Sequence, residues 1–323
     1  WAQEQEPFPP KIRLPISHWK TLVRDTRKQR QTTLLSSEFF AQLPLDKIQR
    51  IKNDFAGQPV EIVFTIRPMV SLLPSIYQQY LKFGLREDYE SWLHHMFDAP
   101  GESKITPTFW KRHPQSAVIR KWADVFGVEN ITVVVADERN PSFLIDSFNN
   151  DILGLDKPVL KLPNAKIVNR SLTVSEMAYL LQLNRQLPEN YTWREYEDLI
   201  RNGVVKRFTD HVSVAAEEPK LKTPQWALDI AKQMTADDVA AITQLKIRVL
   251  GDLNRMLEAT GNRGETSFPT AIPVSVAVDA TLAFRYGKLA RSIPQQMFSA
   301  IRKERIRKAF EWRFGRLLRM FRR

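Results

Sequence analysis

The chain has 323 residues, 43% of them hydrophobic, which is enough for one large or two modest folded domains and excludes a disordered protein. It contains no cysteine, which excludes a disulfide framework, thiolate catalysis and cysteine-bound metal and fits a reducing compartment such as the cytoplasm. Residues 291–323 supply +9 of the net charge of +12, through 11 basic and 2 acidic residues, so the basic charge belongs to the tail. It gives no reason to expect nucleic-acid binding by the body.

Three short segments have the composition of buried β-strands. They are residues 32–36 (TTLLS), 60–66 (VEIVFTI) and 131–136 (ITVVVA). The second and third are nearly continuous apolar, β-branched runs, as expected of strands covered on both faces. Helical patterns alternate with them over residues 45–57, 72–84 and 113–127. This alternation predicts an α/β fold with a parallel sheet core flanked by helices and right-handed crossovers.

Beyond about residue 170 the strand signals fade and helical patterns dominate. They cover residues 175–187, 192–205 and 227–257 and the basic tail. The predicted organisation is an α/β domain with a helical C-terminal layer over residues 1–260, a loop over 261–275 and a basic amphipathic helical extension over 276–323.

Polar residues follow each predicted strand, where ligands bind in open parallel sheets. They are Ser36-Ser37-Glu38, Arg67-Pro68 and Asp137-Glu138-Arg139. Of these, Asp137 and Glu138 are interpreted as caps of the next helix. Arg67 is the most informative, because a guanidinium can chelate a phosphate through two N–H groups. The alternative for Arg67 is a salt bridge to Glu61 or to another carboxylate at a strand end.

Ser75 lies eight residues after Arg67, about one and a half turns into the next predicted helix. Its hydroxyl, together with the N–H groups and dipole of the helix N-terminus, would contribute to binding the same anion. Pro74 is tolerated only near a helix start, so we expect the helix to begin close to Ser75. The alternative for Ser75 is a simple helix-start cap.

A strand ending in Arg, then Pro, then Ser eight residues on before an aromatic helix resembles the 3′-phosphate-binding segment of sulfotransferases that use 3′-phosphoadenosine 5′-phosphosulfate. More of the chain fits, because LLSSEFF, RPMVSLLPSIYQQY, TPTFWKRH, ITVVVADE and NRSLTVSEM occur in this order. Over roughly residues 19–257 the chain resembles bacterial sulfotransferase-like P-loop proteins. The resemblance implies a P-loop nucleotide-transferase-like fold in which Arg67 and Ser75 hold the donor's 3′-phosphate, and Asn169 and Arg170 belong to a loop closing over the nucleotide.

The implied activity is transfer of a sulfuryl group to a hydroxyl acceptor, such as one on a carbohydrate or glycan, with no metal. The family begins with a strand, a Gly-rich phosphate loop containing Lys, and a helix, and nothing before Ser36 resembles that segment. The GxxG at residues 261–264 has Glu where the Lys belongs and no strand before it, so we do not interpret it as a phosphate loop. Because the chain starts at Trp1 without an initiator Met, we expect the missing segment to precede it; the alternative is a degenerate member of the family.

Sulfuryl transfer to an alcohol needs a general base. Glu38 and His113 are the main candidates, since His113 is expected in a loop, where catalytic groups are common. For Glu38 the alternative is a carboxylate favoured by a helix N-terminus. His94 and His95 are weaker candidates on a predicted helix, where one of the two must face away from the core. The spacing of these side chains suggests no metal site.

An acceptor pocket is one interpretation of the aromatic pair Phe109 and Trp110 beside Lys111 and Arg112, because aromatic and basic side chains together suit a sugar or an anionic glycan. The alternative is a core anchor with a solvated basic edge.

The tail has an amphipathic pattern suited to an anionic membrane surface, with Ile306, Phe310, Phe314, Leu317 and Phe321 on one face and arginines between them. Docking on a partner or on the protein's own body, or a nucleic-acid arm, are the alternatives. No apolar run approaches the ~20 residues of a membrane span. We therefore predict a cytoplasmic, membrane-peripheral protein.

A non-catalytic binding protein of the same fold is the second functional hypothesis. A P-loop kinase relative is disfavoured because kinases bind no 3′-phosphate.

Overall fold

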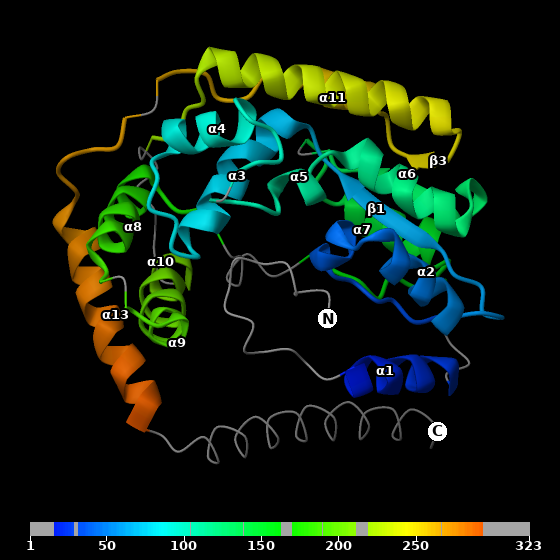
Figure 1. Cartoon of the computed structure of the whole chain (residues 1–323), viewed down its shortest axis with the longest axis horizontal. Coiled ribbons are helices and arrows are strands. Elements are labelled where there is room, and N and C mark those ends of the chain that lie inside the picture. Colours follow the sequence, from blue (N-terminus) through cyan, green and yellow to red (C-terminus); the bar gives the residue numbers. More distant parts are fainter. Residues whose placement is uncertain are drawn as a thin grey trace. The chain divides into compact units, whose positions relative to one another are not determined.

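The structure is a computed structural model that describes residues 16–28, 32–103, 105–137, 139–162, 170–188, 190–210, 219–265 and 267–292 (Figure 1), with side chains up to residue 284. The chain divides into two compact units. The first comprises Trp1–Glu189 and Ser213–Ile272, and the second comprises Asn190–Val212 and Pro273–Arg323.

The first unit is built around a small parallel sheet in the order β1-β2-β3. The strands are β1 (Ile62–Ile66), β2 (Ile131–Val135) and β3 (Arg248–Leu250). In the register, Ile62 is paired with Ile131 and Thr132 with Arg248. All three strands point the same way, so their carboxyl ends meet at one edge, as the predicted α/β fold requires.

Helices connect and cover these strands. They are α1 (Ile16–Lys28), η2 (Glu38–Gln42), α2 (Leu45–Asp54), α3 (Met69–Leu81), α4 (Tyr89–Phe97), α5 (Phe109–Arg112), α6 (Gln115–Phe126), η3 (Val128–Asn130), α7 (Phe143–Ser147), η4 (Phe148–Ile152), α8 (Val174–Gln186), α11 (Gln225–Leu245) and α12 (Asn254–Leu257).

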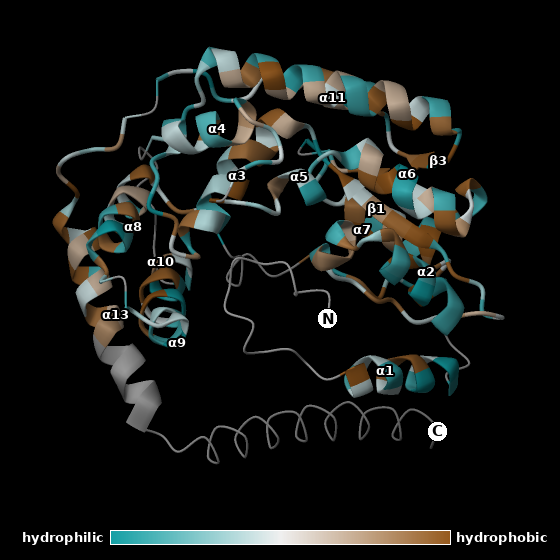
Figure 2. Cartoon of the chain, viewed as in Figure 1, coloured by the Kyte–Doolittle hydropathy of each residue, from teal (hydrophilic) through white to brown (hydrophobic). Residues whose placement is uncertain are grey.

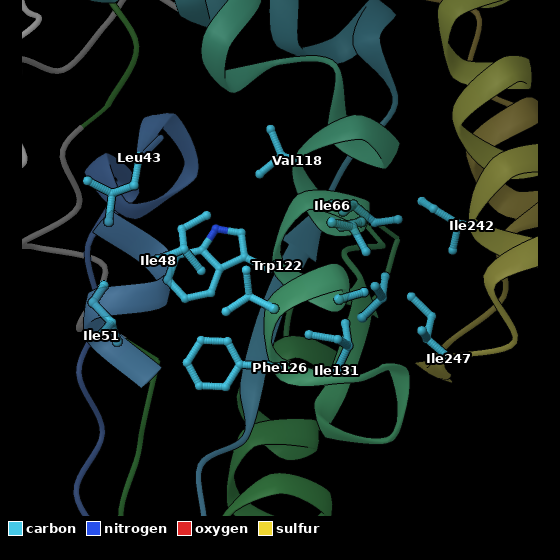
Figure 3. Close-up of a cluster of buried hydrophobic side chains, with 14 of the residues drawn as sticks. Leu43, Ile48, Ile51, Ile66, Val118, Trp122, Phe126, Ile131, Ile242 and Ile247 are labelled. Atoms are coloured by element: carbon cyan, nitrogen blue, oxygen red, sulfur yellow. The ribbon is translucent and has the colours of Figure 1, made fainter. Parts of the chain in front are cut away.

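The core of this unit lies where α6 packs over the sheet, between α2 and α11 (Figure 3). The apolar stripe of α6 alternates every three to four residues, which points one face of the helix inward. Brown, hydrophobic residues run along β1 and alternate with teal ones along α11 (Figure 2). The cluster includes Leu43, Ile48, Ile51, Ile66, Val118, Trp122, Phe126, Ile131, Ile242 and Ile247.

The helix α6 shows how local sequence sets an element's limits. Pro114 precedes its first residue, where a missing N–H costs nothing, and its φ of −68° is already compatible with the start of a helix. Gly127 ends the helix at φ +92°, a conformation that residues with a Cβ rarely adopt. A Cβ there would also lie 2.3 Å from the Glu129 carboxylate.

Two of the three predicted strands are confirmed, but only β2 is buried along its whole length; β1 is an edge strand whose residues are mostly half-buried, with Thr65 exposed. The prediction of a strand over residues 32–36 is wrong. This segment is not part of the sheet, and all its residues except the half-buried Leu35 are exposed, with Leu34 at 46%. Its composition gives it a high intrinsic β-propensity, but the segment has no buried face. Burial against neighbouring residues is what stabilises a strand.

The third strand lies instead inside the predicted helix over residues 227–257. Lys246 adopts a left-handed conformation (φ 52°) that terminates α11, and Gly251 (φ +92°) ends β3. Three strand residues leave too little periodicity to be recognised between two helices. The prediction of helix α8 over residues 175–187 is confirmed with a start at Val174.

The expectation that a helix begins close to Ser75 is also wrong. The helix α3 starts at Met69, with Pro68 as its N-cap residue, and Pro74 lies inside it. As the sixth residue of the helix, Pro74 is displaced by only one turn from the tolerated positions. Ser75 is therefore in the second turn, as its distance from Arg67 suggested.

The second unit is helical. Its elements are α9 (Trp193–Tyr196), the π-helical η6 (Glu197–Val205), α10 (Lys206–Asp210) and α13 (Val274–Ser292). Arg207 on α10 pairs with Asp279 on α13 at 2.7 Å. The amphipathic tail, Ile306 to Phe321, lies outside the described residues. In the part of the chain that is described, no helix is both long and apolar enough to cross a membrane.

Candidate functional site

The carboxyl edge of the sheet carries Arg67, one of the predicted site residues. Arg67 and Pro68 follow β1 directly and lead into α3. The peptide N–H of Ala136, the residue after β2, donates to Ile66 O at 3.0 Å, so the two strand ends stay together beyond the sheet. Asp137 follows on the β2 side. This edge is the place where parallel sheets bind ligands.

Arg67 is held through its backbone by the side chain of Gln115, the first residue of α6. The Arg67 N–H donates to Gln115 Oε1 at 3.1 Å, and Gln115 Nε2 donates to Arg67 O at 2.8 Å. A primary amide is one of the few side chains that can supply a donor and an acceptor to one residue's backbone. The main chain of Arg67 is therefore fixed, and its half-buried side chain lies at the sheet edge.

The alternative pairing of Arg67 with Glu61 does not fit the strand geometry. Glu61 precedes β1 while Arg67 follows it, so the two are roughly 20 Å apart at about 3.3 Å per residue. Glu61 instead accepts a hydrogen bond from Thr132 Oγ1 at 2.6 Å and pairs with Arg248 at 3.6 Å.

Ser75 is exposed on the second turn of α3. It lies six residues after Met69, about 9 Å along the axis at 1.5 Å per residue. It is therefore not among the free N–H groups of the helix N-terminus, and its hydroxyl would meet an anion only along the side of α3.

Glu38 is the first residue of η2 and lies near the Tyr80 hydroxyl on α3. The partner of that hydroxyl is Thr108, the residue before α5. The hydroxyls of Tyr80 and Thr108 are 3.1 Å apart, and Thr108 is fully buried. Burial raises the pKa of Tyr80, the Thr108 hydrogen bond lowers it, and the Glu38 charge raises it further. Glu38 itself is exposed and caps no helix with its side chain; Ser37 accepts from Phe39 N at 3.3 Å instead.

His113, the other predicted base, is the C-cap residue of α5 rather than part of an open loop. Its neighbour Arg112 connects α5 to η2, because Arg112 Nε donates to Gln42 Oε1 at 3.2 Å and its guanidinium lies 4.9 Å from the Phe39 ring centre. Burial lowers the pKa of Arg112 to about 10. Both predicted bases thus belong to neighbouring elements, η2 and α5.

The protonation of His113 supplies a test of its environment. Burial, with a further contribution from Arg112, lowers the pKa of His113 from 6.5 to about 4. As the pH falls, His113 therefore takes up a proton in the unfolded chain before it does so in the folded protein. The stability that is present above pH 6.5 is lost as the pH falls towards 4. We expect a loss of about 2 kcal/mol, since one pKa unit corresponds to about 1.4 kcal/mol.

The measurement is chemical denaturation of the wild type and His113→Gln at pH 7 and at pH 4.5. The wild type should lose more stability between the two values than the variant, which has no titrating ring. Equal losses would show that His113 is well solvated.

The segment before α8, predicted to close over the nucleotide, is described from Arg170 onward, and Asn169 lies outside the described residues. Arg170 forms two hydrogen bonds with Glu176, at 2.8 and 2.6 Å, and a third with Ser171 O at 2.8 Å. Glu176 completes a capping box with Thr173 at the start of α8. The guanidinium of Arg170 is therefore already paired within the segment.

A buried glutamine connects this segment to α3. The peptide N–H of Leu172 donates to Gln78 Oε1 at 2.9 Å, and Gln78 is one turn beyond Ser75 on the same helix. The structure thus places Leu172 against α3, one turn beyond Ser75.

The aromatic pair proposed for an acceptor pocket has the anchoring role instead. Phe109 is fully buried, and Trp110 Nε1 donates to Met96 O at 2.9 Å. His94 and His95 are both exposed on α4, and the His94 ring is stacked on Trp226 with ring centres 4.4 Å apart. None of these side chains borders the strand ends that carry Arg67.

A network of charges covers the carboxyl ends of β2 and β3. Arg139 pairs with Asp137 at 3.1 Å and with Glu258 at 2.9 Å, while Arg255 lies 3.6 Å from Glu258. Hydrogen bonds from Arg139 lower the pKa of Asp137. Asp137 also accepts from the Arg139 N–H at 3.0 Å, so it caps a turn, and Glu138 lies outside the described residues.

Two pockets border this unit. One of about 310 Å³ lies between α11, the start of α3 and α12, and is lined by residues including Val70, Lys232, Thr235 and Met256. Another of about 470 Å³ lies between α1 and α2 and is lined by Lys20, Arg24, Arg27 and Lys28 along one wall.

The GxxG at residues 261–264 is paired with Thr223, whose N–H donates to Asn262 O at 2.8 Å.

Sequence reasoning missed Gln115, Thr108 and Asp238 as residues of this site. Each has an ordinary local context, and only long-range contacts reveal their position.

Within the described ranges, no three His, Asp or Glu side chains converge as a metal site would require. In comparisons with known proteins, no family model, no curated protein and no solved structure matches this chain.

Proposed function

We propose that this chain binds the 3′-phosphoadenosine end of a phosphosulfate donor at the carboxyl edge of β1, as part of a sulfotransferase-like protein. The observation that carries the proposal is the position of Arg67. It is the first residue after β1, an edge strand of the parallel sheet, and its main chain is held by hydrogen bonds with Gln115 at 3.1 and 2.8 Å. A guanidinium on a fixed main chain can chelate a phosphate at little entropic cost.

The helix α3 supports the same placement. Ser75 is exposed on this helix, which begins two residues after Arg67, and the buried Leu172–Gln78 hydrogen bond brings residues 170–172 to the same helix. In the proposal, Asn169 and Arg170 belong to the segment covering the nucleotide. Because Arg170 is paired with Glu176, its contribution is to hold that segment in place.

The proposed reaction is transfer of a sulfuryl group to a hydroxyl, for example on a carbohydrate. The acceptor oxygen bonds to sulfur, the bond from sulfur to the bridging phosphate oxygen breaks, and 3′-phosphoadenosine 5′-phosphate leaves. The hydroxyl proton passes to a general base. Glu38 is the proposed base because it is exposed beside the Tyr80 and Thr108 hydroxyls. His113, with its pKa near 4, is neutral at pH 7 but a weak base.

The family's Gly-rich Lys loop is not in this sequence, so the part of the reaction that can be tested directly here is nucleotide binding. The experiment is a calorimetric titration with 3′-phosphoadenosine 5′-phosphate and, in parallel, adenosine 5′-phosphate. We expect Arg67→Ala to weaken binding of the first by about 1.5–3 kcal/mol, or about 10- to 150-fold.

Arg120→Ala, which removes an exposed arginine of α6, is the matched control and should bind like the wild type. The effect of Arg67→Ala on adenosine 5′-phosphate should be small. If the wild type binds neither nucleotide, or prefers neither, the proposal of a 3′-phosphate site is refuted.

A second candidate function, binding at an anionic membrane surface without catalysis, is favoured by the groove between α1 and α2. Lys20, Arg24, Arg27 and Lys28 are all exposed there on the last three turns of α1. Exposed cations near such a surface contribute about 1 kcal/mol each. The test is co-sedimentation with vesicles containing phosphatidylserine. Changing these four residues to Gln should reduce binding more than changing four exposed basic residues elsewhere.

A further inference from the structure

The turn that carries Arg67 is held by polar side chains of two other elements, α6 and α11, and by the ring of its own Pro68. Gln115 on α6 bonds both backbone groups of Arg67. Pro68 follows with φ −61°, the value set by its ring. The next peptide N–H, that of Met69, donates to Thr235 Oγ1 of α11 at 3.1 Å in a buried position. Three consecutive residues of the turn are therefore fixed.

Asp238 on α11 anchors the residue next to Gln115. Asp238 Oδ1 accepts from the Ser116 N–H at 2.8 Å, so this carboxylate caps the start of α6. Asp238 is only 4% exposed, and its other oxygen, Oδ2, accepts no hydrogen bond within the described part of the chain by distance and angle. Burial raises the pKa of Asp238, and hydrogen bonds from Ser116 and Gln115 partly offset that effect.

Thr235 and Asp238 are three residues apart on α11, so they lie on one face of the helix. That face contacts both the start of α3, through Met69, and the start of α6, through Ser116. The start of α3 follows Arg67 after one residue, and the start of α6 carries Gln115, which bonds the Arg67 backbone. A single helix that is distant in sequence, α11, therefore holds both the start of α3 and the start of α6.

We propose that Gln115, supported by Asp238 and Thr235, is the positioning residue for a 3′-phosphate monoester bound by Arg67. This inference rests on the proposed function. A bidentate guanidinium–phosphate contact tolerates errors of only about 0.5 Å and 10–20°. A rotation of the Arg67 peptide would move the guanidinium further than that, because the side chain is long. Gln115 prevents the rotation by bonding the N–H and the carbonyl together.

The test compares Gln115→Met with the wild type, measuring affinities for 3′-phosphoadenosine 5′-phosphate and for adenosine 5′-phosphate by calorimetry. The methionine has a similar size and makes neither hydrogen bond. We expect the preference for the nucleotide that carries the 3′-phosphate to fall about 10-fold, as for two lost neutral hydrogen bonds. Affinity for adenosine 5′-phosphate should change less than twofold.

Asn184→Leu is the matched control. Asn184 is a buried amide that donates to Leu81 O and Leu85 O, both at 2.9 Å, at the other end of α3. Its loss should lower stability and leave the preference for the 3′-phosphate intact. A general loss of order would instead reduce that preference in both variants, and that result would overturn the positioning role.

A charge-swapped pair keeps the inference testable if Gln115→Met fails to fold. Gln115→Glu places a second carboxylate beside Asp238 and removes the donor to Arg67 O. Adding Asp238→Asn returns the net charge to its original value and supplies an amide next to the new carboxylate. The preference should fall in the single variant and stay low in the double variant, because the donor to Arg67 O is missing in both. Recovery of the wild-type preference in the double variant would overturn the inference, because the added charge and not the lost hydrogen bond would then explain the fall.

The outcomes separate this inference from the proposed function. If the wild type does not prefer the 3′-phosphorylated nucleotide, the proposed function fails and the positioning role falls with it. If the preference exists and Arg67→Ala removes it, while Gln115→Met keeps it within twofold, only the positioning role is overturned.

Discussion

Replacing Trp122 with Ala is expected to lower the free energy of unfolding by about 3–5 kcal/mol, the range for removing a large aromatic residue from a core. Trp122 is 3% exposed and is the point where α6 meets two other elements, η2 and β1. Its ring centre lies 6.3 Å from that of Phe40, 6.5 Å from that of Phe64 and 5.7 Å from that of Phe126. Its loss leaves a cavity between η2 and β1 that these rings cannot fill without moving.

The matched variant is Trp122→Phe. The indole Nε1 of Trp122 is buried and has no hydrogen-bond partner among the described residues, so phenylalanine removes an unsatisfied donor while it keeps most of the ring volume. We expect a loss of at most about 1–1.5 kcal/mol. Urea denaturation of all three proteins is the measurement. A loss under about 1 kcal/mol for Trp122→Ala would contradict the packing of α6 described here.

The second large effect is expected at the ion pair that precedes α8. Glu176→Ala should cost about 3–5 kcal/mol, because it leaves a mostly buried arginine charge without its partner. The side chains of Arg170 and Glu176 are 18% and 4% exposed, and they form two short hydrogen bonds. The substitution also removes one half of the capping box with Thr173.

Two further variants isolate the charge from the cap. Glu176→Gln can still cap α8, so its smaller loss measures the ion pair. Adding Arg170→Met removes the remaining charge and should return the protein to within about 2 kcal/mol of the wild type. The measurement is denaturation at two salt concentrations. If Glu176→Ala costs less than about 1 kcal/mol, the pair is screened by solvent and the segment before α8 is not fixed by it.

Local pattern was sufficient to predict the elements with strong periodicity or continuous burial. The apolar runs of β1 and β2 and the amphipathic stripes of α2, α6 and α8 predicted their type and approximate limits. The failures occurred where the local signal was weak or ambiguous. Residues 32–36 have strand composition but no sheet partner, and β3 is too short to be separated from the helix before it.

The start of α3 is a failure of another kind. Pro74 favours a helix start locally, but the helix begins five residues earlier at Met69, whose N–H is accepted by Thr235 of α11. A partner 166 residues away outweighs the local preference. The same limitation applied to Trp110, which reads equally well as a pocket wall or as an anchor until its hydrogen bond to Met96 is seen.

Local sequence alone predicted that Arg67 follows a β-strand, that Ser75 lies on the next helix, and that the positive charge is concentrated in the tail. These are properties of neighbouring residues, and periodicity and composition report them. The residues that hold Arg67 are visible only in the folded chain, because Gln115 is 48 residues away and Asp238 is 122 residues from Ser116. A buried polar side chain is placed by the partners that compensate its lost hydration, and those partners come together only when the chain folds.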